Sequence, residues 1–285
     1  MRSIQTKLKR YRAAVLKAAC EGHLVPTEAE LARKENRIYE SAEILLQRIL
    51  KERCEKWNGK GKYKEPTTPD IVDLPSLPEG WTWVSLDQLQ LLLKNGISVK
   101  PAAKAGLPIL RINSVRPLSV DFDQVRYLNA RPSDYLEYVL NEGDLLFTRY
   151  NGNPELVGVC GVVPLLTSPL VHPDKLIRCK LVPGVVLANY VAIMVNVGVS
   201  RDYLAKRVRT TAGQSGISGG DLKELPIPLA PLAEQQRIVA EVERRLSIIE
   251  ELEAATSAEL QRATHLRQAI LQQAFSGRLA PPLEK

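Results

Sequence analysis

The sequence predicts an α+β protein, with one mixed α/β domain flanked by long helices that form coiled coils. Residues 232–275 contain neither Gly nor Pro, which predicts a helix far longer than those of ordinary domains. A motif near the N-terminus recurs near the C-terminus, and short β-rich runs lie between the two copies. We therefore expect a helical arm over 1–59, a Pro-rich linker over 60–78, a globular domain over 79–228 and a long helix over 229–285.

The repeated motif defines both ends of the chain. RAAVLKAACEGHLVP at 12–26 recurs as RQAILQQAFSGRLAP at 267–281, and seven of the fifteen aligned positions are identical. Each copy has the pattern of an amphipathic helix that a glycine ends, at Gly22 and at Gly277. The chain should therefore begin and end in the same kind of supersecondary unit.

A second helix is expected in the arm. Thr27 and Glu30 have the spacing of a capping box. In this motif the side chain of each residue accepts a hydrogen bond from the backbone N–H of the other. Apolar residues from Leu31 to Leu50 then form one face, and the pattern ends near Trp57. These residues predict one continuous helix.

The long C-terminal helix shows a coiled-coil pattern. Apolar residues recur at spacings of three and four from Val239 to Ala274. At about 1.5 Å per residue, the whole helix over 232–275 would be roughly 65 Å long. The net charge of residues 229–285 is −1, so the helix is not expected to bind phosphates. A partner protein should cover the seam instead, and its candidate contact residues are Val239, Val242, Leu246, Ile249, Leu252, Leu266 and Ile270.

The central domain is expected to contain both strands and helices. Its β-rich runs are WTWVSL, PILRINSV, DLLFTRY, LVGVCGVV and KLIRCKLV, and helices are expected over about 187–197 and 200–209. A glycine-rich loop, TTAGQSGISGG, and a short extended segment, KELPIPLA, complete it.

The distribution of charge favours a nucleic-acid partner. The chain carries a net charge of +7, and within the domain residues 91–120 and 203–220 contain basic side chains but no carboxylate. The alternative is an ordinary solvated charged face. The phosphate-contact candidates are Lys94, Lys100, Lys104, Arg116, Arg207 and Arg209.

Base contacts are expected from other residues of the same domain. Arg111 and Asn113 occupy alternate positions of an expected strand, so they would share a face and could reach guanine and adenine edges. Arg111 could instead pair with a carboxylate. Arg149, Tyr150 and Asn151 lie where an expected strand ends in an Asn-Gly turn, and they suit base or phosphate contact, although a plain hairpin turn is equally compatible with them. Gln214 and Ser215 of the glycine-rich loop are further candidates.

Four motifs of the chain can be compared with known families: PLAEQQRIVAEVE, LRQAILQQAFSGRLAP, the segment Leu77-Pro78-Glu79-Gly80-Trp81 that begins the domain, and GDLLFTR at 143–149. Together they resemble the specificity subunit of type I restriction-modification systems. The resemblance implies a target-recognition domain that reads one half of a bipartite DNA site. It also implies helices that bind the methyltransferase subunits, which use S-adenosylmethionine, and a restriction subunit that joins through this core.

The chain departs from that family in one respect. A complete specificity subunit has two recognition domains and two long helices, whereas this chain has one of each. It resembles a half-length subunit, either a natural half or a fragment. Such a half would act as a homodimer or pair with a different half. A helical scaffold that binds protein rather than DNA is the alternative function.

Other classes of protein are not indicated. No methyltransferase tetrapeptide, cofactor-binding glycine motif or metal-ligand spacing is present, so we expect a non-catalytic chain with no cofactor or metal of its own. Leu181 to Ser200 carries no charge, but Pro and Gly interrupt it, so we do not expect a membrane span. The four cysteines are expected to be reduced and mostly buried, in a cytoplasmic protein.

Overall fold

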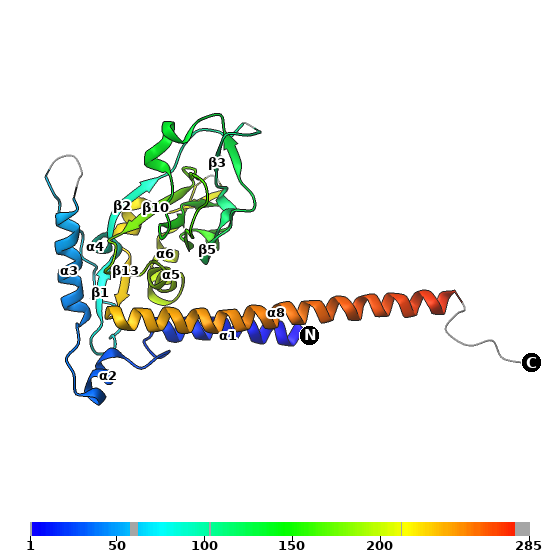
Figure 1. Cartoon of the computed structure of the whole chain (residues 1–285), viewed down its shortest axis with the longest axis horizontal. Helices are drawn as coiled ribbons and strands as arrows, with labels where there is room; N and C mark the ends of the chain where they lie inside the picture. The colour runs from blue at the N-terminus through cyan, green and yellow to red at the C-terminus, as the bar shows by residue number, and fades with distance from the viewer. Residues whose placement is uncertain (1, 58–61, 103, 212, 277–285) are drawn as a thin grey trace, which may run out of the picture. The chain divides into compact units, whose positions relative to one another are not determined.

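The computed structural model describes residues 2–57, 62–102, 104–211 and 213–276, and the chain forms two compact units (Figure 1). Lys17–Val239 form the first, which we call the globular unit. The second, the helical unit, combines the N-terminal residues up to Leu16 with the chain from Ala240 onward. The boundaries expected at 59, 78 and 228 stay predictions.

Among the described residues, the helical unit consists of parts of two helices, α1 (Arg2–Cys20) and α8 (Leu232–Phe275). Residues 17–20 of α1 and 232–239 of α8 belong to the globular unit. The length of α8 confirms the long helix expected from the sequence. Figure 1 shows α1 lying along α8, and Arg12 forms ion pairs with Glu250 and Glu253, each at 3.6 Å. The buried apolar residues of this unit are Leu8, Val15, Leu16, Val242, Leu246 and Ile249.

The arm continues with two helices where the sequence predicted one. The Thr27 capping box is confirmed, but α2 spans only Glu28–Glu35 and ends at Asn36, which adopts a left-handed conformation with φ of 51°. Asn tolerates that conformation better than most residues and ends the helix there. Ser41 then caps a new helix, α3, over Ala42–Glu55. The prediction of one continuous helix was therefore wrong, since it weighed apolar spacing above these two caps.

The described residues of the domain form four sheets. The largest has the strand order β2-β10-β7-β9-β5-β4, and all of its neighbouring strands are antiparallel except β5 and β9. The others pair β1 with β13, β3 with β6, and β11 with β12 and β8. The strands are β1 (Thr82–Ser85), β2 (Gln90–Asn95), β3 (Leu107–Ile109), β4 (Val115–Arg116), β5 (Leu118–Val120), β6 (Arg126–Leu128), β7 (Leu145–Thr148), β8 (Tyr150–Asn151), β9 (Cys160–Val162), β10 (Leu176–Leu181), β11 (Arg209–Thr211), β12 (Gln214–Gly216) and β13 (Pro226–Leu229).

Short helices connect and cover these strands. The two helices expected near 187–197 and 200–209 are confirmed as α5 and α6, and the glycine-rich segment expected as a loop contains the β11–β12 hairpin. The helices are α4 (Leu86–Leu89), α5 (Ala188–Asn196), α6 (Gly198–Arg207) and α7 (Gly219–Lys223), with 3-10 turns at Ile112–Ser114, Pro132–Tyr138 and Pro154–Leu156. The predicted α+β class is thus confirmed.

The burial of the four cysteines agrees only in part with the prediction from the sequence. Cys160 and Cys179 are buried, but Cys54 is exposed and Cys20 half-buried, so the cysteines are not mostly buried as expected; all four are free thiols. Among the helices described, none has the length and hydropathy needed to cross a bilayer.

A buried ion pair links β10 to the residue before β7 in the main sheet. Arg178 of β10 contacts Asp144 at 2.7 Å and also donates to the Val139 carbonyl oxygen at 2.8 Å. Asp144 accepts a further bond from the Asn141 backbone N–H at 2.7 Å. Burial raises the pKa of the Asp144 carboxyl, and the Asn141 hydrogen bond and Arg178 oppose that shift. Asp144 of the GDLLFTR motif therefore has a structural role.

A second buried carboxylate joins three distant segments of the globular unit. Glu234, in the first turn of α8, accepts hydrogen bonds from the Trp81 indole N–H at 2.9 Å and from the Glu28 backbone N–H at 2.8 Å. Glu28 in turn forms ion pairs with Arg37 and Arg237, each at 2.6 Å. The arm, the start of the domain and the start of α8 are therefore connected at one point.

Replacing Glu234 by Ala should destabilise the globular unit, because it leaves two buried N–H donors without an acceptor. The expected loss is about 2–5 kcal/mol of unfolding free energy, measured by urea denaturation. Gln236→Ala, at an exposed position of the same turn, is the control and should change stability by less than about 0.5 kcal/mol. Equal unfolding free energies for the two variants would show that the hydrogen bonds of Glu234 do not stabilise the globular unit.

Candidate nucleic-acid interface

Two hollows adjoin on the globular unit and share Asp174 and Lys175. The larger, of about 640 Å³, is lined by residues of β8, β11 and β12, and the smaller, of about 420 Å³, by the segments around Lys100 and Arg111. The basic residues that line them are Lys100, Arg111, Arg126, Arg149, Lys175 and Arg209. Four of these six were candidates from the sequence, and they come from segments up to 109 positions apart.

Tyr150 lies beside two cations in the larger hollow. The Arg149 guanidinium carbon is 4.6 Å from the ring centroid and the Lys175 ammonium nitrogen is 4.9 Å from it. The Arg149 side chain also donates to the Asp174 carbonyl oxygen at 3.3 Å, and the Arg149 backbone N–H donates to the Lys175 carbonyl oxygen at 2.8 Å. An aromatic ring beside two cations suits contact with a nucleotide, whose phosphate attracts the cations.

A glycine makes room for the Tyr150 ring. β8 pairs with β12, and Gly216 lies directly opposite Tyr150. A Cβ atom at Gly216 would lie 2.3 Å from Cδ1 of the ring, which is far inside van der Waals contact. The glycine-rich segment therefore contributes to the hollow by supporting the ring, a role that its sequence did not indicate.

Arg111 and Asn113 line the smaller hollow, but they do not lie on a strand as predicted. Arg111 precedes the 3-10 turn Ile112–Ser114, and Ser114 accepts from its backbone N–H at 3.3 Å. The alternation argument was therefore wrong, although both residues still line the same hollow. Arg111 donates to Gln124 at 2.9 Å, and no carboxylate pairs with it among the described residues.

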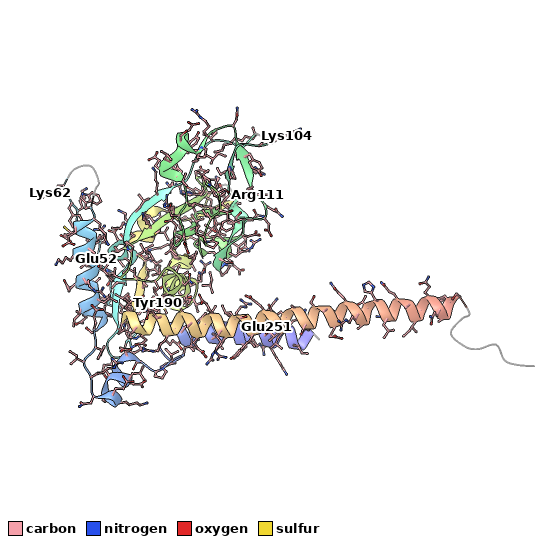
Figure 2. All side chains as sticks on the ribbon, in the orientation of Figure 1. Glu52, Lys62, Lys104, Arg111, Tyr190 and Glu251 are labelled. Carbon is pink, nitrogen blue, oxygen red and sulfur yellow. The ribbon has the colours of Figure 1, made fainter. Side chains whose placement is uncertain are left out.

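Lys104 and Arg116 are exposed and line neither hollow, although Figure 2 shows Lys104 and Arg111 on the same side of the domain. Lys94 forms an ion pair with Glu137 and lies 4.3 Å from the Tyr138 ring centroid. Arg207 lies 3.5 Å from the Tyr203 ring centroid. These four remain predictions, and Lys94 and Arg207 already have partners within the chain.

The remaining candidates lie in the β8–β12–β11 sheet. Gln214 and Arg209 line the larger hollow, and Arg209 is 3.9 Å from Asp221. Asn151 accepts from the Asn153 backbone N–H at 2.9 Å. Ser215 is buried, and its hydroxyl shares a 2.7 Å hydrogen bond with that of Thr210, so its side chain supports the sheet in this structure.

Sequence reasoning missed Lys175 and Arg126. Neither residue lies in a basic stretch free of carboxylates, because Lys175 follows Asp174, and Arg126 follows Asp121 and Asp123. The turn signal Pro173-Asp174 before a strand could have pointed to Lys175, because a residue at a strand edge beside a turn is exposed to a ligand.

Most of the expected partner seam is already covered by the chain. Val242, Leu246 and Ile249 are buried, and Val239 is half-buried. The remaining residues of the predicted seam, Leu252, Leu266 and Ile270, are 48%, 62% and 46% exposed. Within the described ranges no three His, Cys, Asp or Glu side chains gather as a metal site would require.

Relatives of the chain are known. The specificity subunit of the type I restriction enzyme EcoKI from Escherichia coli K12 is 42% identical over 189 residues, which are 66% of this chain and 40% of that protein. The specificity subunit of EcoEI from E. coli is 28% identical over 246 residues, 83% of this chain and 41% of that protein. The chain is therefore homologous to type I restriction specificity subunits. It spans about two fifths of the length of these two relatives.

The fold agrees with this homology. A solved chain described in connection with complex assembly and conformational transition of the type I R-M system aligns with a TM-score of 0.55 and 20% identity. The alignment covers 98% of this chain and 57% of the solved one. No protein-family profile matches the sequence.

Replacing Gly216 by Ala should weaken duplex DNA binding, because the added methyl group would displace the Tyr150 ring from its place beside Arg149 and Lys175. We expect at least a 10-fold rise in Kd, measured by fluorescence anisotropy. Gly152→Ala is the matched control, since no atom lies within 4 Å of a Cβ there and its φ is ordinary. Equal affinity of the two variants would remove Tyr150 from the interface.

Proposed function

We propose that this specificity-subunit homologue reads one half of a bipartite DNA site and catalyses nothing itself. The observation that supports this most directly is the convergence of six basic side chains, one aromatic ring and Asn113 on two adjoining hollows. Cations position a protein on phosphates, whereas Arg, Asn and Gln can read base edges. The relatives are named specificity subunits, which agrees with the proposal.

The partners follow from the same proposal. A methyltransferase subunit would bind the exposed apolar residues of α8, such as Leu252 and Leu266, and would use S-adenosylmethionine to methylate an adenine. A restriction subunit would join through this core, and the complex would act in the cytoplasm. The protein-binding scaffold without DNA specificity is not favoured, since it gives no reason for the basic hollows.

A bipartite site requires a second recognition domain. The chain described here supplies one, so another copy or a different half would supply the other. A two-fold dimer would place identical half-sites in inverted orientation and give a palindromic motif. Pairing with a different half would give a non-palindromic one.

Replacing Lys175 or Arg209 by Ala should weaken binding to all duplex sequences. Each loss of a phosphate contact should reduce the slope of log K against log salt by about 0.9. Lys34→Ala, which removes the same charge from an exposed position of α2, should leave the slope unchanged. An unchanged slope in the Lys175 and Arg209 variants would contradict the proposed phosphate contacts.

Replacing Asn113 by Ala should act differently, because a base contact matters only for the cognate sequence. We expect a loss of about 1–3 kcal/mol on that sequence and little change on others. Binding to a cognate duplex and to a scrambled duplex would be compared by anisotropy. An equal loss on both would make Asn113 a phosphate contact.

The proposed function is tested by co-expressing the chain with its methyltransferase subunit and mapping methylated adenines in the host DNA. We expect methylation confined to a bipartite motif, and its symmetry would identify the second half. Methylation without sequence preference, or its persistence when this chain is omitted, would overturn the proposal.

A further inference from the structure

Asp174 places a free carboxylate where the two hollows adjoin. It lines both of them, and its side chain is half-buried. Among the described residues, only its backbone N–H and carbonyl oxygen form hydrogen bonds, and no cation pairs with its carboxylate. Asp221, the other carboxylate in these linings, accepts from the Ser218 backbone N–H at 2.7 Å and hydroxyl at 2.6 Å, and so caps α7. Asp174 has no such structural role.

The backbone of Asp174 is held on both sides. Its N–H donates to the Ile97 carbonyl oxygen at 2.9 Å, and its carbonyl oxygen accepts from the Arg149 side chain at 3.3 Å. Gly96 permits this close approach, because a Cβ atom there would collide with the Pro173 carbonyl oxygen. The carboxylate is therefore kept in a defined place before a ligand arrives, which lowers the entropic cost of a specific contact.

A free carboxylate must find a hydrogen-bond donor if DNA covers it. Phosphates would be repelled by Asp174, and a carboxylate that loses its hydration without gaining a donor weakens binding. The backbone of duplex DNA has no donor, since its sugars lack the 2′-hydroxyl group of RNA. The donors that the grooves expose are the exocyclic amino groups of the bases. Only a base edge can therefore satisfy Asp174 directly.

Cytosine suits a carboxylate better than the other two amino bases. The N6 amino group of adenine lies beside the N7 acceptor, which repels a carboxylate and favours an amide such as Asn. The N2 amino group of guanine lies in the minor groove, which is only about 6 Å wide and lined by acceptors. The N4 amino group of cytosine is a donor in the wide major groove.

We propose that Asp174 reads cytosine through its N4 amino group and so specifies a C·G pair in the half-site. This inference rests on the proposed function and assigns one part of the reading to one residue. The cations around Asp174 hold the phosphates on either side, and Asp174 rejects sequences that offer no amino group at its position.

Asp174→Asn, made in the complex with the methyltransferase subunit, tests the assignment by methylation mapping. One C·G position of the wild-type motif should change to A·T, because an amide can accept from N6 of adenine and donate to N7. Asp202→Asn is the matched control: it removes the same charge at an exposed position of α6 that lines neither hollow, and it should keep the wild-type motif. Urea denaturation checks that both variants are folded.

The outcomes separate this inference from the proposed function. A sequence-specific motif that contains no C·G pair, or that Asp174→Asn leaves unchanged, would overturn the role of Asp174 alone. The same holds if Asp174→Asn raises affinity equally for all duplexes, since the carboxylate would then only repel phosphates. Methylation by the wild-type complex without sequence preference would instead contradict the proposed function.

A base analogue tests the contact itself. The mapped cytosine is replaced by pyrimidin-2-one, which lacks the 4-amino group, and binding to both duplexes is measured by fluorescence anisotropy for wild type and Asp174→Ala. The analogue also weakens its own base pair, so the ratio of the two affinities is compared between the proteins. We expect that ratio to be about 10-fold larger for wild type. Equal ratios would overturn the proposal.

Discussion

The buried carboxylate of Glu234 is the contact on which the globular unit depends most. It accepts one hydrogen bond from the Trp81 indole and one from the Glu28 backbone, so segments more than 150 positions apart meet at a single side chain. Burial raises the pKa of Glu234, while the two hydrogen bonds and nearby Arg237 stabilise its charged form. Two motifs that carry the family resemblance, LPEGW and PLAEQQ, therefore contact each other and have a structural explanation.

The proposed DNA-binding surface depends on close approach of backbones elsewhere in that unit. The β8–β12 pair places Gly216 against Tyr150, and the turn before β10 places the Lys175 ammonium nitrogen 4.9 Å from the centroid of the same ring. The main sheet is held in turn by the buried pair of Arg178 and Asp144. The hollows are thus formed by loops and short strands that this scaffold holds in place.

Periodicity and capping predicted much of the fold. The 44-residue helix, the Thr27 capping box and the helices near 187–207 all follow from local patterns. The break at Asn36 was missed because an apolar stripe continues across it. Arg111 and Asn113 were assigned to a strand because a 3-10 turn of three residues has no period that a sequence shows.

The site was predictable in composition but not in arrangement. Residues of four candidate segments do line the hollows, yet Lys175 and Arg126 were hidden by neighbouring aspartates. Which cations gather on one surface depends on the pairing of β8 with β12 and on the turn at Pro173, and both are long-range contacts. The burial of Val242, Leu246 and Ile249 was likewise not predicted, because no local pattern indicates which parts of a helix other elements will cover.

Backbone hydrogen exchange, measured with and without duplex DNA, tests the central claim most directly. If DNA lies in the two hollows, exchange should slow at residues 97–113, 148–151, 172–176 and 209–217, while α3 and the end of α8 stay unchanged. Protection confined to the helices, with none at these four segments, would contradict the account.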